Sequence, residues 1–235
     1  TGNNILLGTF TAANPSTCTS GTTCVFNMGG TTTFLSSTSV FDYGASSITL
    51  NNVLLGDGVT LYLGGGSSGS ITVASITGTA GGSASNVVIN TSGAVSVTGA
   101  IGTDIGTLTI TNAGGATFGG AVTVSTVALT SATGTIAFND VLTANTLSTT
   151  SNAYNVAINA SGSAITNAVT FSNTGTVSLG SSGGAQTYTG GITATAPSSS
   201  TLKGTINTTN AAMTFGPVTL GANTTLNSNA STNAG

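Results

Sequence analysis

LTITNAGGATFGGAVTV (Leu108–Val124) is the first of three copies of one pattern; the others are NVAINASGSAITNAVTF (Asn155–Phe171) and GTINTTNAAMTFGPVTL (Gly204–Leu220). In each copy, a short run of alternating apolar residues ends at an isoleucine and leads into a turn of small and polar residues. A second run, of the form x-Val-Thr-apolar, follows the turn. The isoleucines stand at positions 110, 158 and 206, so the interval between copies is the same both times. Self-similarity at a fixed period predicts a stacked repeat architecture.

Weaker echoes of the same run fall between the copies, at roughly half of that interval. The full interval is therefore predicted to span two coils of an all-β solenoid, with about 21–27 residues and two or three short strands per coil. We expect the three isoleucines to occupy equivalent inward positions two coils apart. The predicted repeat-core residues are Ile89, Ile110, Ile136, Ile158, Leu179 and Ile206.

Charged residues make up only 2% of the 235 residues, against about a quarter in a typical soluble domain. The sequence has one Lys and four Asp, and no Glu, Arg, His or Trp. A single cation gives no basic surface for nucleic acid, and no run of 18 apolar residues predicts a membrane-spanning helix. Abundant Thr, Val, Gly and Asn favour half-buried strands joined by turns. The regular alternation and the low net charge of −3 argue against disorder.

Residues 1–63 hold both cysteines and four of the eight phenylalanines, and we predict irregular N-terminal coils or a cap there. Residues 64–235 are predicted to be the repetitive solenoid, in one continuous domain with the first part. Gly64–Gly66 is interpreted as either a flexible linker or a tight corner; strand-like residues resume within five positions, which favours the corner. The terminal GANTTLNSNASTNAG has no charge or proline to protect a strand edge, so we expect it to belong to a longer array or to stack on another molecule.

Cys18 and Cys24 enclose the turn CTSGTTC, and we predict a disulfide that holds this turn. A disulfide would indicate an oxidising, extracellular compartment. Two free thiols are one alternative. Half of a metal site is the other, although the sequence offers no His or further Cys to complete four ligands.

TFGGAVTV (117–124), AVTFSNTGTVSL (168–179) and TFGPVTLGANTTLN (214–227) resemble the degenerate repeats of bacterial autotransporter passengers and filamentous-haemagglutinin-type exoproteins. The resemblance covers roughly residues 86–227. It implies a right-handed parallel β-helix that is secreted and then displayed on, or released from, a bacterial surface. The near-absence of charge departs from many members of that group.

The four carboxylates, Asp42, Asp57, Asp104 and Asp140, are far apart in sequence, and Lys203 is the one basic residue. β-Helix enzymes that act on polysaccharides need clustered carboxylates with basic groups that stabilise negative charge. We therefore expect no enzyme, no catalytic residue, no metal and no cofactor. A calcium site built from carbonyls and either Asp57 or Asp104 is the alternative, although Ca²⁺ requires six to eight oxygen ligands.

Asn90, Asn159 and Asn207 each follow the isoleucine position and open an Asn-x-Ser/Thr triplet. We predict that they stack into a ladder at one corner of the coil, with glycosylation of the same triplets as the alternative. A flat threonine ladder would suit ice binding, but the Thr-x-Thr pairs do not recur at the coil period. These pairs are Thr31/Thr33, Thr107/Thr109/Thr111, Thr187/Thr189 and Thr193/Thr195.

The sequence thus indicates a non-enzymatic structural segment of a secreted or cell-surface fibrous protein: an extracellular filament, a surface layer or an adhesin stalk. The expected partner is the chain itself, end to end or laterally, because few charges repel neighbouring copies. Host or environmental surfaces and glycans are further candidates; nucleic acid and membrane insertion are not expected. Two alternatives stay open, an ice-binding β-solenoid and a carbohydrate- or surface-binding adhesin, whose candidate aromatic residues are Tyr43, Tyr62, Tyr154 and Tyr188.

Overall fold

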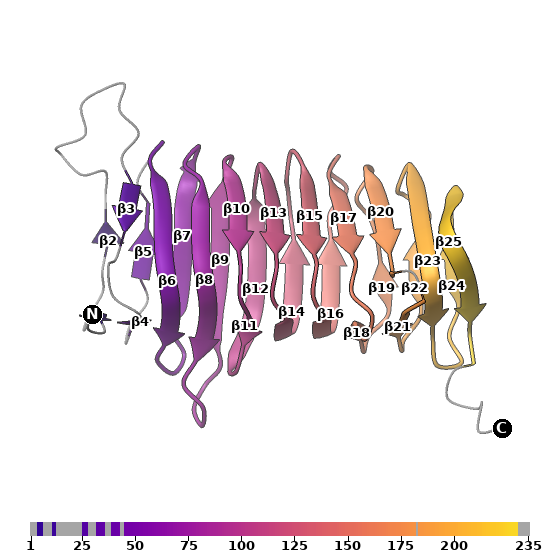
Figure 1. The fold of residues 1–235 in the computed structure, drawn as a ribbon, viewed down its shortest axis with the longest axis horizontal. Helices are drawn as coiled ribbons and strands as arrows, with labels where there is room; N and C mark the ends of the chain where they lie inside the picture. Colours follow the sequence, from indigo (N-terminus) through magenta and orange to yellow (C-terminus); the bar gives the residue numbers. More distant parts are fainter. Residues whose placement is uncertain are drawn as a thin grey trace.

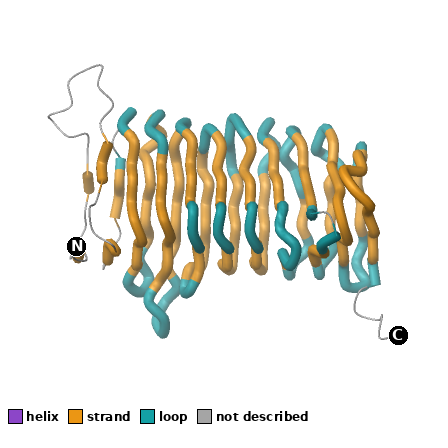
Figure 2. Tube along the Cα trace, viewed as in Figure 1, coloured by secondary structure: helices purple, strands orange, loops and turns teal. Residues whose placement is uncertain are grey.

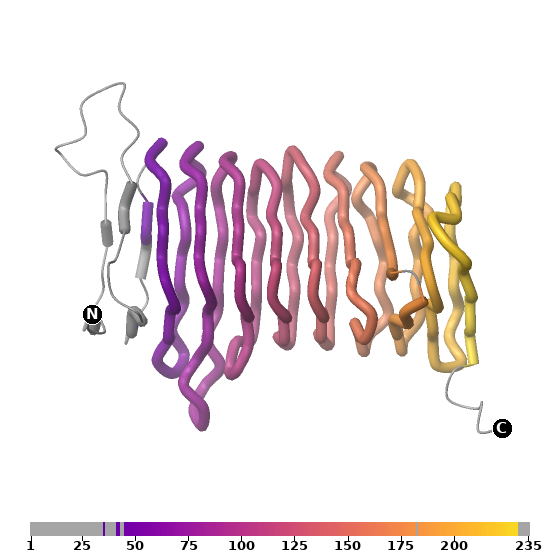
Figure 3. The backbone as a smooth tube through the Cα atoms, in the orientation of Figure 1, coloured from indigo at the N-terminus to yellow at the C-terminus, as the bar shows by residue number. Residues whose placement is uncertain are grey.

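The computed structural model describes residues 4–6, 11–12, 25–27, 32–35, 39–42, 45–181 and 183–229. These residues form a parallel β-solenoid of about nine turns with about 21 residues each, and every turn lies on the one before it (Figures 1 and 3). The predicted fold class is therefore confirmed, with a coil at the short end of the predicted range. Right-handed coiling stays a prediction.

Each turn adds strands to three parallel stacks, here called ladders I, II and III, which the chain visits in that order. Ladder I contains β3 (Val25–Asn27), β6 (Ser47–Leu55), β8 (Ile71–Gly78), β10 (Ala94–Val97), β13 (Gly115–Phe118), β15 (Thr135–Phe138), β17 (Asn155–Ile158), β20 (Thr176–Leu179), β23 (Ser199–Asn207) and β25 (Val218–Asn227). Ladder II contains β1 (Asn4–Leu6), β4 (Thr32–Leu35), the second halves of β6 and β8, β11 (Ile101–Gly102), the starts of β14 (Val122–Leu129) and β16 (Leu142–Thr149), β18 (Ala164–Ile165), β21 (Ala185–Tyr188) and the ends of β23 and β25.

Ladder III runs along the remaining side of the coil. It contains β2 (Thr11–Ala12), β5 (Ser39–Phe41), β7 (Thr60–Ser67), β9 (Ser85–Thr91), β12 (Ile105–Asn112) and the second halves of β14 and β16. A separate three-stranded sheet follows, made of β19 (Val169–Thr170), β22 (Ile192–Ala194) and β24 (Met213–Phe215). The Thr149 hydroxyl joins β16 to this sheet, because Oγ1 donates to the Thr170 carbonyl at 3.2 Å and accepts from the Ser172 N–H at 2.7 Å.

The core consists of columns of side chains that repeat from coil to coil. Successive residues of a strand point to opposite faces, so the alternating tetrads bury every second side chain, as in β9 and β17. Parallel pairing in register then sets like positions over one another. One buried column of ladder I runs Leu50, Val73, Val97, Phe118, Phe138, Ile158, Leu179 and Leu202.

Corners between the ladders are short loops, which Figure 2 shows in teal at both edges of the stack. At the corner before ladder I, glycines lie over one another: the Gly114 N–H donates to the Gly93 carbonyl at 2.8 Å. A Cβ added at Gly134 would lie 2.4 Å from the Gly114 oxygen, so a side chain does not fit this approach. Gly64 and Gly66 adopt positive φ angles of 76° and 89° inside β7, where the register with β9 shifts between Leu63 and Ser67. The segment is therefore an irregular stretch near the end of a strand, and the corner itself follows at residues 68–70.

Two buried polar side chains, Ser163 and Gln186, interrupt the apolar interior of ladder II. Ser163 and Gln186 occupy successive inward positions, one residue before the registered pair Ala164 and Thr187. Gln186 Nε2 donates to the carbonyls of Ile158 and Ala160 at 2.8 and 2.9 Å. The buried Tyr188 hydroxyl donates to Gln186 Oε1 at 3.0 Å. These hydrogen bonds compensate the loss of water around the buried groups.

Candidate functional site

The last coil of the described chain, formed by β24 and β25, ends the stack (Figure 1). β25 pairs with β23 and β24 pairs with β22, each on one side. Among residues 45–181 and 183–229, no strand pairs with the other edge of β24 or β25. An isolated antiparallel bridge joins Thr209, just before β24, to Asn229, just after β25. Such an edge presents unpaired backbone N–H and C=O groups and is a template for another strand.

The apolar columns of the core continue into this coil and emerge at its surface. Leu202 is 1% exposed, whereas its register partner Leu220 is 67% exposed. Ile206 is fully buried, whereas its partner Leu226 is 50% exposed. Val218 is also exposed, and Met213 and Phe215 of β24 are only partly buried against the core. The exposed apolar groups thus lie in core positions that no further coil covers among the described residues.

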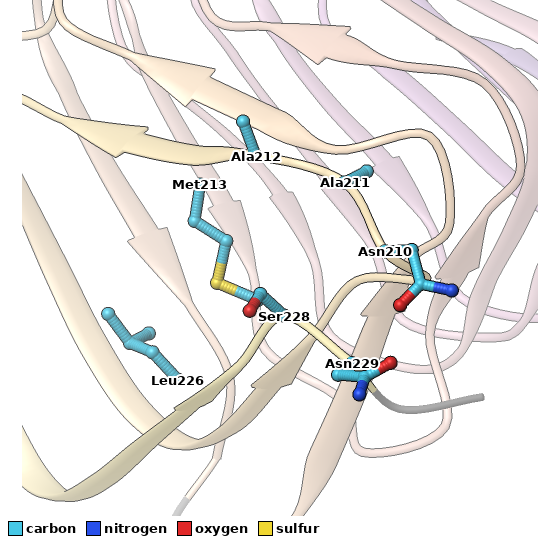
Figure 4. Close-up of a pocket in the computed structure, with 7 residues that line it drawn as sticks. All are labelled: Asn210, Ala211, Ala212, Met213, Leu226, Ser228 and Asn229. Atoms are coloured by element: carbon cyan, nitrogen blue, oxygen red, sulfur yellow. The ribbon is translucent and has the colours of Figure 1, made fainter. Parts of the chain in front are cut away.

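A pocket of about 650 Å³ opens at the same end of the solenoid (Figure 4). Met213 and Leu226 give it an apolar wall, and the side chains of Asn210 and Asn229 lie at its rim. Thr208 Oγ1 donates to the Ala211 carbonyl at 2.6 Å and fixes the loop behind the pocket. The lining includes no titratable side chain. The pocket therefore offers packing surface and amide hydrogen bonds, and it offers no acid or base.

The described carboxylates lie at corners of the coil. The Asp57 carboxylate accepts from Thr79 Oγ1 at 2.7 Å, and the Asp140 carboxylate accepts from the Val141 N–H at 2.7 Å. Asp104 lies one coil beyond Ser83 at the corner that also holds Asp57, and its Oδ2 atom is buried without a hydrogen-bond partner. In the described ranges, no three His, Cys, Asp or Glu side chains gather into a group able to hold a metal ion.

The six predicted repeat-core side chains are all buried, but the prediction that the isoleucines of the three copies occupy equivalent places is wrong. Ile89 and Ile110 are partners in ladder III; Ile136, Ile158 and Leu179 belong to ladder I; Ile206 belongs to ladder II. Two turns from Ile110 end at Thr149, well before the chain reaches Ile158. The interval between copies therefore overshoots two turns and reaches the next face of the coil.

The predicted single asparagine ladder is also corrected, because its three members lie at different corners. Each stacks on another asparagine instead: Asn90 on Asn112, Asn159 on Asn139 and Asn207 on Asn227. The Asn159 Nδ2 donates to Asn139 Oδ1 at 2.8 Å. Glycosylation at the three triplets stays a prediction. Cys18 and Cys24 lie outside the described residues, and so does Tyr43; the predicted disulfide stays a prediction.

The adhesin alternative requires clustered exposed aromatic side chains, and the ice-binding alternative requires regular rows of threonine. Of the three described tyrosines, Tyr154 and Tyr188 are buried, and Tyr62 is 39% exposed. Tyr154 donates its hydroxyl to the Leu129 carbonyl at 2.8 Å, so it is a core residue. One row of threonines runs over three coils at Thr107, Thr126 and Thr146. In the row two residues further along the strands, Thr109 is followed by Ala128 and Ser148. A regular double ladder of threonines is therefore broken after one coil.

No protein-family model matches the chain, and neither the curated proteins nor the solved structures contain a match to it. None of the described residues belongs to a helix long and apolar enough to cross a membrane. In the last described coil, apolar side chains at core positions are exposed, whereas their register partners in the preceding coil are buried.

Proposed function

We propose that this chain is a non-enzymatic structural segment of an extracellular fibrous protein, in which it acts as a stiff rod. The observation that carries the proposal is the single core: one cluster of buried apolar side chains runs from Leu35 and Phe41 to Leu202 and Ile206. Each coil is held to the next by parallel backbone pairing along three ladders. About nine turns at a strand spacing of about 4.8 Å give a rod roughly 43 Å long.

The chemistry of the surface supports a mechanical role. Catalysis of bond cleavage needs a positioned acid and base, and among the described residues no three His, Cys, Asp or Glu side chains gather into a group. Recognition of glycans relies on clustered exposed aromatic rings, and Tyr62 is exposed alone among the described tyrosines. The resemblance of residues 86–227 to secreted passengers supports an extracellular, bacterial-surface location.

The test is immunoelectron microscopy of the cells that produce the protein, with antibodies against the described coils. We expect label along extracellular fibres or surface layers. Label confined to the cell interior would overturn the proposed role, and label confined to fibre tips would favour the adhesin alternative. A control antibody preadsorbed with the purified chain should leave the fibres unlabelled.

A further inference from the structure

A pocket of about 390 Å³ opens on the side of the rod, where three successive coils pass from ladder II to ladder III. The coils contribute the corner between β11 and β12, then β14, then β16 (Figure 1). The volume lies in the range of small-molecule sites, about 300–1,000 Å³. The lining combines apolar side chains with hydroxyl, amide and carboxylate groups, and Asp104 supplies its single carboxylate. The class of ligand therefore depends on the state of Asp104.

The corner that carries Asp104 is fixed by backbone hydrogen bonds to two other strands. The Gly78 N–H donates to the Thr103 carbonyl at 2.6 Å, and the Ser85 N–H donates to the Asp104 carbonyl at 2.9 Å. Thr103 and Asp104 have φ angles of 47° and 62°, a region that a β-branched residue rarely adopts. Strained residues of this kind cluster at binding sites, where the surrounding structure holds them. Asp104 thus stands in a set position at the pocket.

The Asp104 carboxylate lacks a partner within the described chain. Its Oδ2 atom is buried and accepts no hydrogen bond there, although buried polar atoms normally have a partner. The strongest hydrogen bonds to a carboxylate come from cationic N–H donors. A ligand that carries such a donor would satisfy this group.

The surrounding coils have negative charge and no cation of their own. Residues 45–181 contain three aspartates and no Lys, Arg or His. Asp57 lies near the same corner as Asp104, since the Gly58 N–H donates to the Ser83 carbonyl at 2.6 Å. Lys203 belongs to β23, which ladder II reaches three pairings beyond β16. Negative charge attracts cations, and a cation for this pocket has to come from another molecule.

The rest of the lining selects the kind of cation. An ammonium group has three N–H donors and no acceptor, and Ser125, Thr143 and Asn145 offer exposed side-chain oxygens beside Asp104. Ca²⁺ usually takes six to eight oxygens with several carboxylates, whereas this lining has one carboxylate.

The apolar part of the lining, which includes Ile105 and Val124, suits an aliphatic stem, because lysine stems lie along apolar surface while the charged head stays polar. We propose that this pocket binds a primary ammonium group on an aliphatic stem, from a free diamine or from a lysine side chain of another protein. The site is separate from the proposed structural role, and that role does not depend on it.

The experiment titrates the 235-residue protein with amines and follows the backbone amide signals by NMR. Cadaverine represents a free diamine, and a lysine blocked at both its α-amino and carboxyl groups represents a protein side chain. With either ligand, we expect shifts at Thr103–Ile105, Thr123–Ser125 and Thr143–Asn145, and weaker binding at high salt. Pentanediol, which has the same length without charge, should cause no such shifts. Binding of cadaverine alone would assign a free amine as the ligand, and binding of the blocked lysine would assign a protein side chain.

Asp104→Asn tests the role of the carboxylate, and it should bind the same amine about tenfold more weakly. Asp140→Asn is the matched control, because it removes the same charge from an exposed position outside the pocket lining, and it should bind like wild type. Circular dichroism checks that both variants keep their strands.

Three results would overturn the inference. The first is equal binding by Asp104→Asn and wild type, and the second is an equal response to pentanediol. The third is a set of shifts spread along the rod, or shifts at these residues that Ca²⁺ causes at lower concentration than the amine.

Discussion

The rings of Phe118 and Phe138 stack on neighbouring coils of ladder I, with their centroids 5.0 Å apart and their planes at 12°. Both side chains are fully buried and are register partners in β13 and β15. Near-parallel rings on adjacent strands let each coil place a large side chain directly over the last, so the two coils pack closely at this point.

Phe138→Ala should lower the free energy of unfolding by about 3–5 kcal/mol, because the substitution removes the ring and leaves a cavity between two coils. Phe138→Leu fills more of the space and should cost about 1.5 kcal/mol or less. Urea unfolding followed by circular dichroism measures both. Thr117→Ala on the outward face of the same ladder is the control, expected within about 0.5 kcal/mol of wild type. Equal effects of Phe138→Ala and Thr117→Ala would contradict the stacked core.

Tyr188 should make stability fall at alkaline pH. Burial raises the pKa of the Tyr188 phenol well above its ordinary value of 10.0. Above pH 10 the unfolded chain loses this proton while the folded chain keeps it, so stability present below pH 10 is lost as the pH rises, by about 1.4 kcal/mol per unit. Tyr188→Phe should lack this part of the slope when unfolding is measured between pH 8 and 11.5.

The same variant has a second signature at neutral pH. Without the Tyr188 hydroxyl, Gln186 Oε1 loses its donor. A buried acceptor without a partner costs about 1–3 kcal/mol, so Tyr188→Phe should be less stable than wild type at pH 8 and should approach it at higher pH. A wild-type slope in Tyr188→Phe would show that another group governs alkaline unfolding.

Gly134→Ala should destabilise the corner before ladder I. The added Cβ would lie 2.4 Å from the Gly114 carbonyl oxygen, and neighbouring backbone has to shift to admit it. We expect a loss of about 1–3 kcal/mol. Gly102→Ala is the matched control, because its Cβ would meet Thr123 at an ordinary 3.4 Å and its φ is not left-handed. Thermal melting should show a lower midpoint for Gly134→Ala alone; a shared drop would argue for a general intolerance of alanine.

Asp104→Asn should stabilise the protein. Asp104 has a φ of 62° and a buried Oδ2 without a hydrogen-bond partner, so one acceptor atom has lost water without a replacement. Asparagine tolerates left-handed backbone and is neutral, and we expect a gain of about 1 kcal/mol in the free energy of unfolding. Asp140→Asn is the control, since Asp140 is exposed. If millimolar Ca²⁺ stabilised wild type and not Asp104→Asn, the corner would be a calcium site and the predicted gain would be wrong.

The amino-acid sequence by itself determined the strands and their inward faces. Alternation in runs such as Asn155–Ile158 is local, because the backbone of a strand turns successive side chains to opposite sides. The recurrence of these runs, with glycine and asparagine between them, was enough to predict a stacked solenoid, whereas parallel strands were implied by the resemblance to secreted passengers.

Only the tertiary structure decided which residues meet. Turn length depends on each corner: two turns lead from Ile110 to Thr149, whereas two turns from Ile158 take a longer stretch of chain and end at Leu202. A fixed sequence period therefore drifts from one ladder to the next. The hydrogen-bond partners of Asn159 and Gln186 lie on neighbouring coils, so they depend on the length of each turn. The exposure of Leu220 has a related origin, because a residue in a core column is buried only when another coil lies over it.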